Sequence, residues 1–176
     1  MHIEDITAVL EYEDLRNVVL VGHSYGGMVI TGVAEKAGPR LAQLVYLDAF
    51  LPENGKSVKD YAKLNPTRED GWRVPVPGSA PRFGITDEHD VAWMEKRLGD
   101  QPSKTFIEPI QISSGDSRSV QRSFIQCTMA PFFSEAAGRA KKSGFRSREL
   151  FAGGHDVMIA KPELLARVLL ELANTI

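Results

Sequence analysis

The chain has 176 residues, a formal net charge of −2 and 43% hydrophobic residues. This length is enough to bury the core of one globular domain, and the composition is ordinary for such a domain. The near-neutral charge and the lack of a basic run argue against binding to nucleic acid or to an anionic membrane.

Cysteine content and hydropathy bear on where the protein works. Cys127 is the only cysteine, so no intramolecular disulfide can form, which fits a reducing compartment. No apolar stretch approaches the length of a membrane span, and the start of the chain at 1–5 is too acidic for a signal peptide. We therefore expect a cytoplasmic protein.

The first third of the chain predicts a helix and then a parallel β-α-β unit. Apolar residues recur on one face of a short opening helix at 3–10. The apolar run at 17–21 predicts a strand covered on both faces. Residues 27–37 predict a largely buried helix, and 44–50 predict a second strand. This order and spacing favour a right-handed parallel crossover.

Residues 52–104 differ from the rest because they are rich in proline, glycine and charge and contain no strand-like run. We expect a cap with one short helix near 87–98, inserted into a single domain that spans 1–176. Trp72, Trp93 and Met94 are candidates for an apolar pocket under the cap, although ordinary packing within the cap explains them equally well.

Regular alternation resumes after the cap. A strand is predicted at 123–128, a helix at 133–142, a strand at 146–152, and a last amphipathic helix that begins with Pro162. The predicted fold class is therefore α/β, with a mostly parallel sheet.

The most informative motif is the pentapeptide GHSYG at 22–26, which follows the first predicted strand. A G-x-S-x-G sequence between a strand and a helix is typical of a nucleophile elbow, in which the serine takes a strained backbone conformation. Gly22 and Gly26 would remove Cβ atoms that collide at the turn. The turn exposes the hydroxyl of Ser24 and directs the backbone N–H of Tyr25 to the same point.

Two further polar residues are predicted to lie at the carboxyl ends of strands, where ligands collect in α/β sheets. Asp48 ends the second strand, and His155 follows the last one. A histidine there can accept the proton of Ser24, and its second ring nitrogen then needs a carboxylate partner. Each residue also has a structural explanation that needs no catalysis: Asp48 can cap a turn, and His155 can be a solvated loop residue.

The chain closely resembles the α/β-hydrolase fold family. The segments 22–28 (GHSYGGM), 44–49 (LVYLDA) and 154–156 (GHD) carry the resemblance, which is strongest to small bacterial esterase-like hydrolases related to plant methyl esterases and hydroxynitrile lyases. It implies Ser24 as nucleophile, His155 as general base and the N–H of Tyr25 as an oxyanion donor, with no cofactor and no metal.

The resemblance leaves the triad acid open between three aspartates. The family usually places this acid after the next-to-last strand, but the sequence there, CTMAP at 127–131, has no carboxylate. The family sometimes places it one strand earlier, and Asp48 occupies that position. Asp156 is the second candidate, although its side chain should point away from its neighbour His155. Asp116 precedes a strand and is the least favoured.

A second departure concerns the start of the chain. Complete members of the family have several strands and an oxyanion-loop segment before the elbow strand, and residues 1–16 have room for one short helix only. The sequence therefore predicts an α/β-hydrolase-type fold that lacks the N-terminal strands, with the elbow strand as an exposed apolar edge.

The resulting hypothesis is a serine hydrolase that acts on a small carboxylic ester through an acyl-enzyme, with Asp48 orienting His155. Two alternatives remain open. One is hydroxynitrile-lyase-like C–C cleavage, in which a cap lysine such as Lys56, Lys59 or Lys63 would assist. The other is a non-catalytic remnant of a hydrolase that binds a ligand or a partner. Glu88, His89 and Asp90 read as an exposed helix start rather than a metal site.

Overall fold

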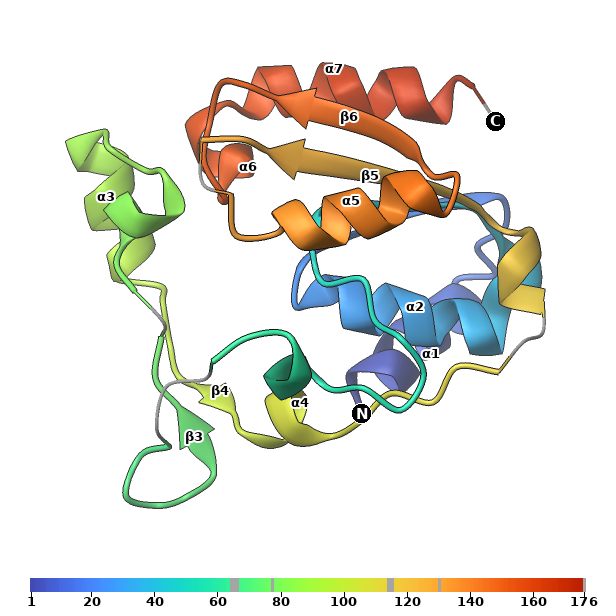
Figure 1. The fold of residues 1–176 in the computed structure, drawn as a ribbon, viewed down its shortest axis with the longest axis horizontal. Helices are drawn as coiled ribbons and strands as arrows, with labels where there is room; N and C mark the ends of the chain where they lie inside the picture. Colours follow the sequence, from blue (N-terminus) through green and yellow to red (C-terminus); the bar gives the residue numbers. More distant parts are fainter. Residues whose placement is uncertain (64–66, 77, 114–115, 130, 176) are drawn as a thin grey trace.

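A parallel sheet with helices on both faces forms the centre of the structure (Figure 1). The structure is a computed structural model that describes residues 1–63, 67–76, 78–113, 116–129 and 131–175. The sheet has four strands in the order β1-β2-β5-β6, and every neighbouring pair is parallel. Its strands are β1 (Val18–Ser24), β2 (Leu41–Ala49), β5 (Gln121–Cys127) and β6 (Arg146–Leu150).

Two apolar layers hold the helices against the sheet. One face is covered by α1 (His2–Tyr12), α2 (Gly26–Ala37) and α5 (Ser134–Lys142). The other face is covered by α6 (Val157–Ala160) and α7 (Pro162–Ala173). Short 3₁₀ turns, Gly38–Arg40 and Asp116–Ser119, precede β2 and β5. Each helix and strand predicted for this part of the chain is present, which confirms the α/β class.

The prediction that the elbow strand is an exposed edge of the sheet is confirmed, while apolar clusters contact it on both faces. β1 lies at an edge of the sheet, and in the described parts of the chain β2 is its one strand partner. Its side chains are mostly half-buried, and Val21 is 38% exposed. The central strand β2 is buried along almost its whole length. An apolar run in the sequence therefore does not separate a central strand from an edge strand.

In Figure 1 the middle of the segment between β2 and β5, around α3, lies beyond the arrowheads of β5 and β6, and the chain then runs below α2 back to the start of β5. It contains α3 (Glu88–Glu95), α4 (Lys104–Ile107) and 3₁₀ turns at Val58–Asp60 and Ala80–Phe83. It also contains an antiparallel pair, β3 (Arg73–Val74) and β4 (Gln101–Pro102), so the prediction of no strand here is wrong. We retain 52–104 as the proposed cap.

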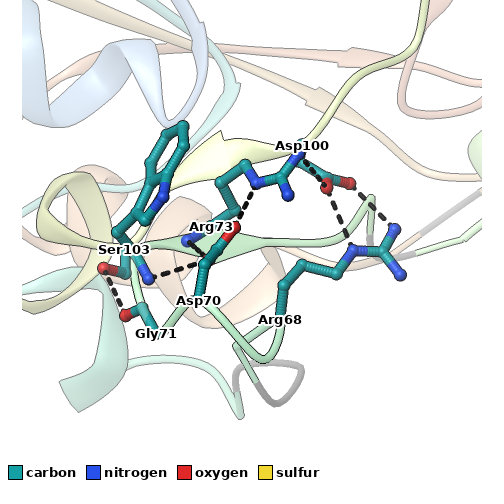
Figure 2. A network of polar contacts seen from close by, with 7 residues as sticks. Arg68, Asp70, Gly71, Arg73, Asp100 and Ser103 are labelled. Atoms are coloured by element: carbon teal, nitrogen blue, oxygen red, sulfur yellow. Dashed lines mark hydrogen bonds and ion pairs between the residues drawn. The ribbon is translucent and has the colours of Figure 1, made fainter.

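A network of polar contacts surrounds the paired strands β3 and β4 (Figure 2). Nε and Nη2 of Arg68 each lie 3.0 Å from the carboxylate of Asp100. Arg73 donates to Asp70 at 2.6 Å, and the backbone N–H of Ser103 donates to the carbonyl of Trp72 at 2.7 Å. Two-residue strands held by ion pairs show no alternating apolar pattern, which is why the sequence did not predict them.

In the described ranges, no helix combines the length and the apolar character needed to cross a bilayer.

Candidate active site

The turn after β1 has the geometry of a nucleophile elbow. Ser24 ends the strand with φ of +52°, and Tyr25 is the N-cap of α2 with φ of −55°. A positive φ is costly for a residue with a Cβ atom, so the surrounding structure must hold it. The backbone N–H of Phe50, just after β2, donates to the carbonyl of Ser24 at 3.1 Å. The predicted strain at Ser24 is confirmed.

Close backbone contacts explain two of the glycines around the elbow. A Cβ atom on Gly22 would lie 2.6 Å from the carbonyl oxygen of Gly26, as predicted. A Cβ atom on Gly26 would meet nothing within 4 Å, so the prediction for this position is wrong. Gly27 is the second constrained residue, because its Cβ would lie 2.0 Å from the carbonyl oxygen of Phe50. The close approach is thus between α2 and the end of β2.

Asp48 and His155 are in direct contact at the carboxyl ends of the strands. The side chain of Asp48 is fully buried, and its Oδ2 lies 2.7 Å from Nδ1 of His155. Its Oδ1 accepts the backbone N–H of Cys127 at 3.1 Å. Because a carboxylate accepts hydrogen bonds, Nδ1 of His155 carries the proton, and the lone pair is on Nε2. That tautomer is the one a general base requires.

Aromatic rings surround the histidine of this pair. Three phenylalanine rings lie 5.4–5.8 Å from the ring of His155, measured between centroids: Phe83, Phe132 and Phe133. Burial, together with the charge of Asp48, raises the pKa of the Cys127 thiol to about 12, so this cysteine stays protonated. The sequence analysis missed the three phenylalanines because they come from the cap and from the loop after β5. The one sequence signal for these rings was the phenylalanine pair at 132–133, which lies a few residues after the end of a predicted strand.

Sheet and cap together line an open cavity of about 690 Å³. Ser24, Tyr25 and His155 line it from the sheet side, while Val58 and Met94 are among the cap residues that line it. Met94 was a predicted pocket residue. The two tryptophans predicted with it are not lining residues: Trp72 is 57% exposed and Trp93 is 44% exposed. Trp93 and Met94 are neighbours on α3 and therefore face different directions.

Two groups of the elbow have no hydrogen-bond partner among the residues that the structure describes. Within the described ranges, the hydroxyl of Ser24 makes no hydrogen bond, including none to His155, and the backbone N–H of Tyr25 has no acceptor. Ser24 and His155 thus share a cavity without a direct hydrogen bond. Such contacts are often loose when no substrate is bound. The free N–H of Tyr25 lies at the start of α2, where a developing negative charge is stabilised.

The other two candidate acids are placed differently. Asp156 points to His23, whose Nε2 lies 3.5 Å from its Oδ1. Burial and the nearby charge of Asp48 raise the pKa of Asp156, while His155 partly offsets this effect. Asp116 begins the 3₁₀ turn before β5, at the amino end of that strand. Of the three, Asp48 is the one that contacts the ring of His155.

The lysines and the remaining histidines considered in the sequence analysis lie in different places. Lys63 lines the cavity, whereas Lys56 and Lys59 are exposed and do not. His89 is exposed, and its backbone N–H donates to Asp87, which caps α3. The side chains of His23, His155 and Asp156 lie close enough to share an ion. However, Nδ1 of His155 and Nε2 of His23 are already engaged in hydrogen bonds.

Fold and site together define a class of protein. A parallel α/β sheet carries a strained serine between its edge strand and a helix, and a buried histidine–aspartate pair lies at the same end of the sheet. This combination is that of the α/β hydrolases.

Comparisons with known proteins identify the family. The alpha/beta hydrolase family matches residues 2–168. A carbendazim hydrolyzing esterase from Nocardioides sp. (strain SG-4G) is 35% identical over an alignment of 192 residues. The alignment covers 97% of this chain and 77% of that protein. Methylesterase 3 from Arabidopsis thaliana is 25% identical, over 92% of this chain and 71% of that protein. The chain therefore belongs to the alpha/beta hydrolase family.

Solved structures show the same fold. An extracellular alpha/beta-hydrolase from a Paenibacillus species superposes with a TM-score of 0.77 at 18% identity, over 96% of this chain and 77% of that one. A methylesterase from Arabidopsis superposes with a TM-score of 0.76 at 20% identity, over 97% of this chain and 75% of that one.

Proposed function

We propose that the chain is a carboxylic ester hydrolase in which Ser24, His155 and Asp48 form the catalytic triad. Ser24 attacks the acyl carbon while Nε2 of His155 accepts its proton. Asp48 keeps the proton on Nδ1 of His155 and stabilises the imidazolium as it forms. The N–H of Tyr25 donates to the developing oxyanion. His155 then returns the proton to the leaving alcohol, and water releases the acid by the same steps in reverse.

The observation that carries this proposal is the 2.7 Å contact between Asp48 and His155, where His155 lines the same cavity as Ser24 with its strained backbone. Similarity to proteins named esterase and methylesterase supports the reaction class. The cavity supports a small substrate, since its apolar lining includes Val58, Met94 and Phe133. We expect small uncharged esters, methyl esters among them, to fit it.

A serine-directed fluorophosphonate probe tests the nucleophile. We expect the wild-type protein to be labelled and Ser24→Ala to lose labelling completely. Ser134→Ala is the matched control, because Ser134 also lines the cavity but donates to the carbonyl of Pro131. Labelling that survives in Ser24→Ala, or is absent from a folded wild-type protein, would overturn the proposal; the second result would favour a non-catalytic hydrolase remnant.

A direct assay separates ester hydrolysis from lyase chemistry. Hydrolysis of a short methyl or p-nitrophenyl ester should be abolished in Ser24→Ala and His155→Gln. Cleavage of a cyanohydrin is the reaction expected of a hydroxynitrile lyase, in which Lys63 is the cap lysine that reaches the cavity. Cyanohydrin cleavage that depends on Ser24 without ester hydrolysis would replace the esterase assignment.

A further inference from the structure

His23, the residue just before Ser24, connects the elbow to the loop that carries His155. Its Nε2 lies 3.0 Å from the backbone carbonyl oxygen of His155, although the two residues are 132 positions apart in the chain. The two imidazole rings lie 4.3 Å apart between centroids, with an angle of 39° between their planes. The side chain of His23 is 27% exposed and lines the same cavity as Ser24.

Hydrogen-bond chemistry fixes the tautomer of His23. A backbone carbonyl can only accept a hydrogen bond. Nε2 of His23 therefore carries the proton, and its N–H donates a hydrogen bond to the carbonyl of His155. The carboxylate of Asp156, 3.5 Å from the same nitrogen, favours a proton there too. Burial, and then the proximity of His155, lowers the pKa of His23 to about 4. His23 is therefore neutral at neutral pH and adds no like charge next to His155 when that ring becomes protonated.

Contacts from three directions hold the His155 loop. Asp48 holds the imidazole ring through Nδ1. The cap holds the main chain after it, because the backbone N–H of Asp156 donates to the carbonyl of Phe83 at 3.0 Å. His23 holds the carbonyl of His155 itself. Of these contacts, the one from His23 comes from the residue directly before Ser24.

We propose that His23 is a positioning residue, whose Nε2–H holds the main chain of His155 at the distance from the elbow that proton transfer from Ser24 requires. This inference rests on the proposed hydrolase function. His23 does not touch the reacting atoms, so it should affect kcat and leave KM nearly unchanged. Small displacements of a catalytic group have large effects on rate, which makes a short tether of this kind effective.

Two amide variants test the inference with the same chemistry at two lengths. In His23→Gln, the side-chain NH₂ reaches about as far as Nε2 of histidine, so the hydrogen bond to His155 can form again. In His23→Asn, the NH₂ reaches only as far as Nδ1 and cannot form it. Both side chains are polar and smaller than histidine, so packing alone affects them similarly. His89→Gln is the control, because His89 is exposed on α3 and is not a lining residue of the cavity.

The measurements are kcat and KM for one short ester, with thermal melting to confirm folding. We expect His23→Asn to lower kcat about tenfold or more, with KM within twofold of the wild-type value. His23→Gln should keep at least a third of the wild-type kcat, and His89→Gln should match the wild type. Equal kcat values for the Gln and Asn variants, or a change in KM alone, would overturn the positioning role while leaving the proposed function intact. Failure of the proposed function itself is recognised separately, by an unlabelled but folded wild-type protein.

Discussion

Asp48 combines two features that are costly for a single residue. Its backbone has φ of +40°, and its carboxylate is completely buried. A buried carboxylate needs hydrogen-bond donors, and both oxygens have one, from Cys127 and from His155. Because both donors come from elements far away in the chain, this arrangement exists only in the folded protein. Functional sites are where such strain is usually maintained.

Replacing Asp48 with asparagine tests its role with almost no change in shape. The amide oxygen can still accept from Cys127, but the amide NH₂ faces Nδ1 of His155 and favours the wrong tautomer. We expect kcat to fall by about 10³- to 10⁴-fold, with circular dichroism unchanged. Asp156→Asn is the comparison, and a larger loss of kcat in that variant would move the acid to Asp156.

His23 should also affect stability at acid pH. Its pKa is lowered from 6.5 to about 4 in the folded protein, chiefly by burial. The unfolded state therefore binds the proton more readily, and the folded state loses stability as the pH falls from about 6.5 to about 4. The full effect is about 3 kcal/mol. The melting temperature of His23→Gln should thus rise relative to wild type as the pH falls through this window. A pH-independent difference would contradict the assignment of a neutral, buried His23.

At the scale of elements, the backbone of the His155 loop contacts the backbone of the cap directly at Gly154. Gly154 lies against the turn at Gly84, which has φ of +91°. A Cβ atom on Gly154 would lie 2.5 Å from Cα of Gly84 and 2.6 Å from the carbonyl oxygen of Phe83. This contact, with the hydrogen bond from Asp156 to Phe83, makes the position of the catalytic histidine depend on the cap.

Gly154→Ala should therefore reduce both stability and activity. The clash is with backbone atoms that cannot rotate away, so we expect a loss of about 1–3 kcal/mol and a marked fall in kcat. Gly138→Ala is the matched control, because Gly138 lies in α5 and a Cβ there meets nothing within 4 Å. That variant should gain about 0.5–1 kcal/mol. Urea unfolding and ester hydrolysis measure the two effects, and an unchanged Gly154→Ala would contradict the close contact.

At the scale of the whole molecule, the cavity lies between two parts that are stabilised differently. The sheet and its helices pack through two apolar clusters. The β3–β4 pair of the cap depends on the exposed network of Arg68, Asp70, Arg73 and Asp100 (Figure 2). The Arg68 guanidinium next to Asp100 holds the pKa of that carboxyl below its usual range. Salt should therefore weaken the cap more than it weakens the sheet.

Substrate affinity should accordingly depend on ionic strength. Between about 0.05 M and about 1 M NaCl, where the screening length falls severalfold, we expect KM of the wild-type protein to rise a few-fold. Asp100→Asn should have a raised KM at low salt and show little further change. Asp90→Asn, a change on α3 outside the network, should behave like the wild type. A KM that responds to salt equally in all three proteins would show that the network does not shape the cavity.

Local patterns in the sequence were sufficient for the elements of the sheet layer and for the elbow. Apolar periodicity marks α2, β2 and α7 because each buries a face of fixed repeat. The elbow is local as well, since Gly22, Ser24 and the preceding strand are contiguous. The two-residue strands of the cap were missed because ion pairs between distant residues, such as Arg68 and Asp100, leave no periodic pattern.

The sequence by itself thus determined the class of fold, the strained serine and a short set of candidate partners. Only the tertiary structure decided which aspartate contacts His155 and that Met94 rather than the tryptophans faces the cavity. The reason is physical. Asp48 and His155 are separated by 107 positions, and a hydrogen bond over that separation forms only when two strands and a loop pack together.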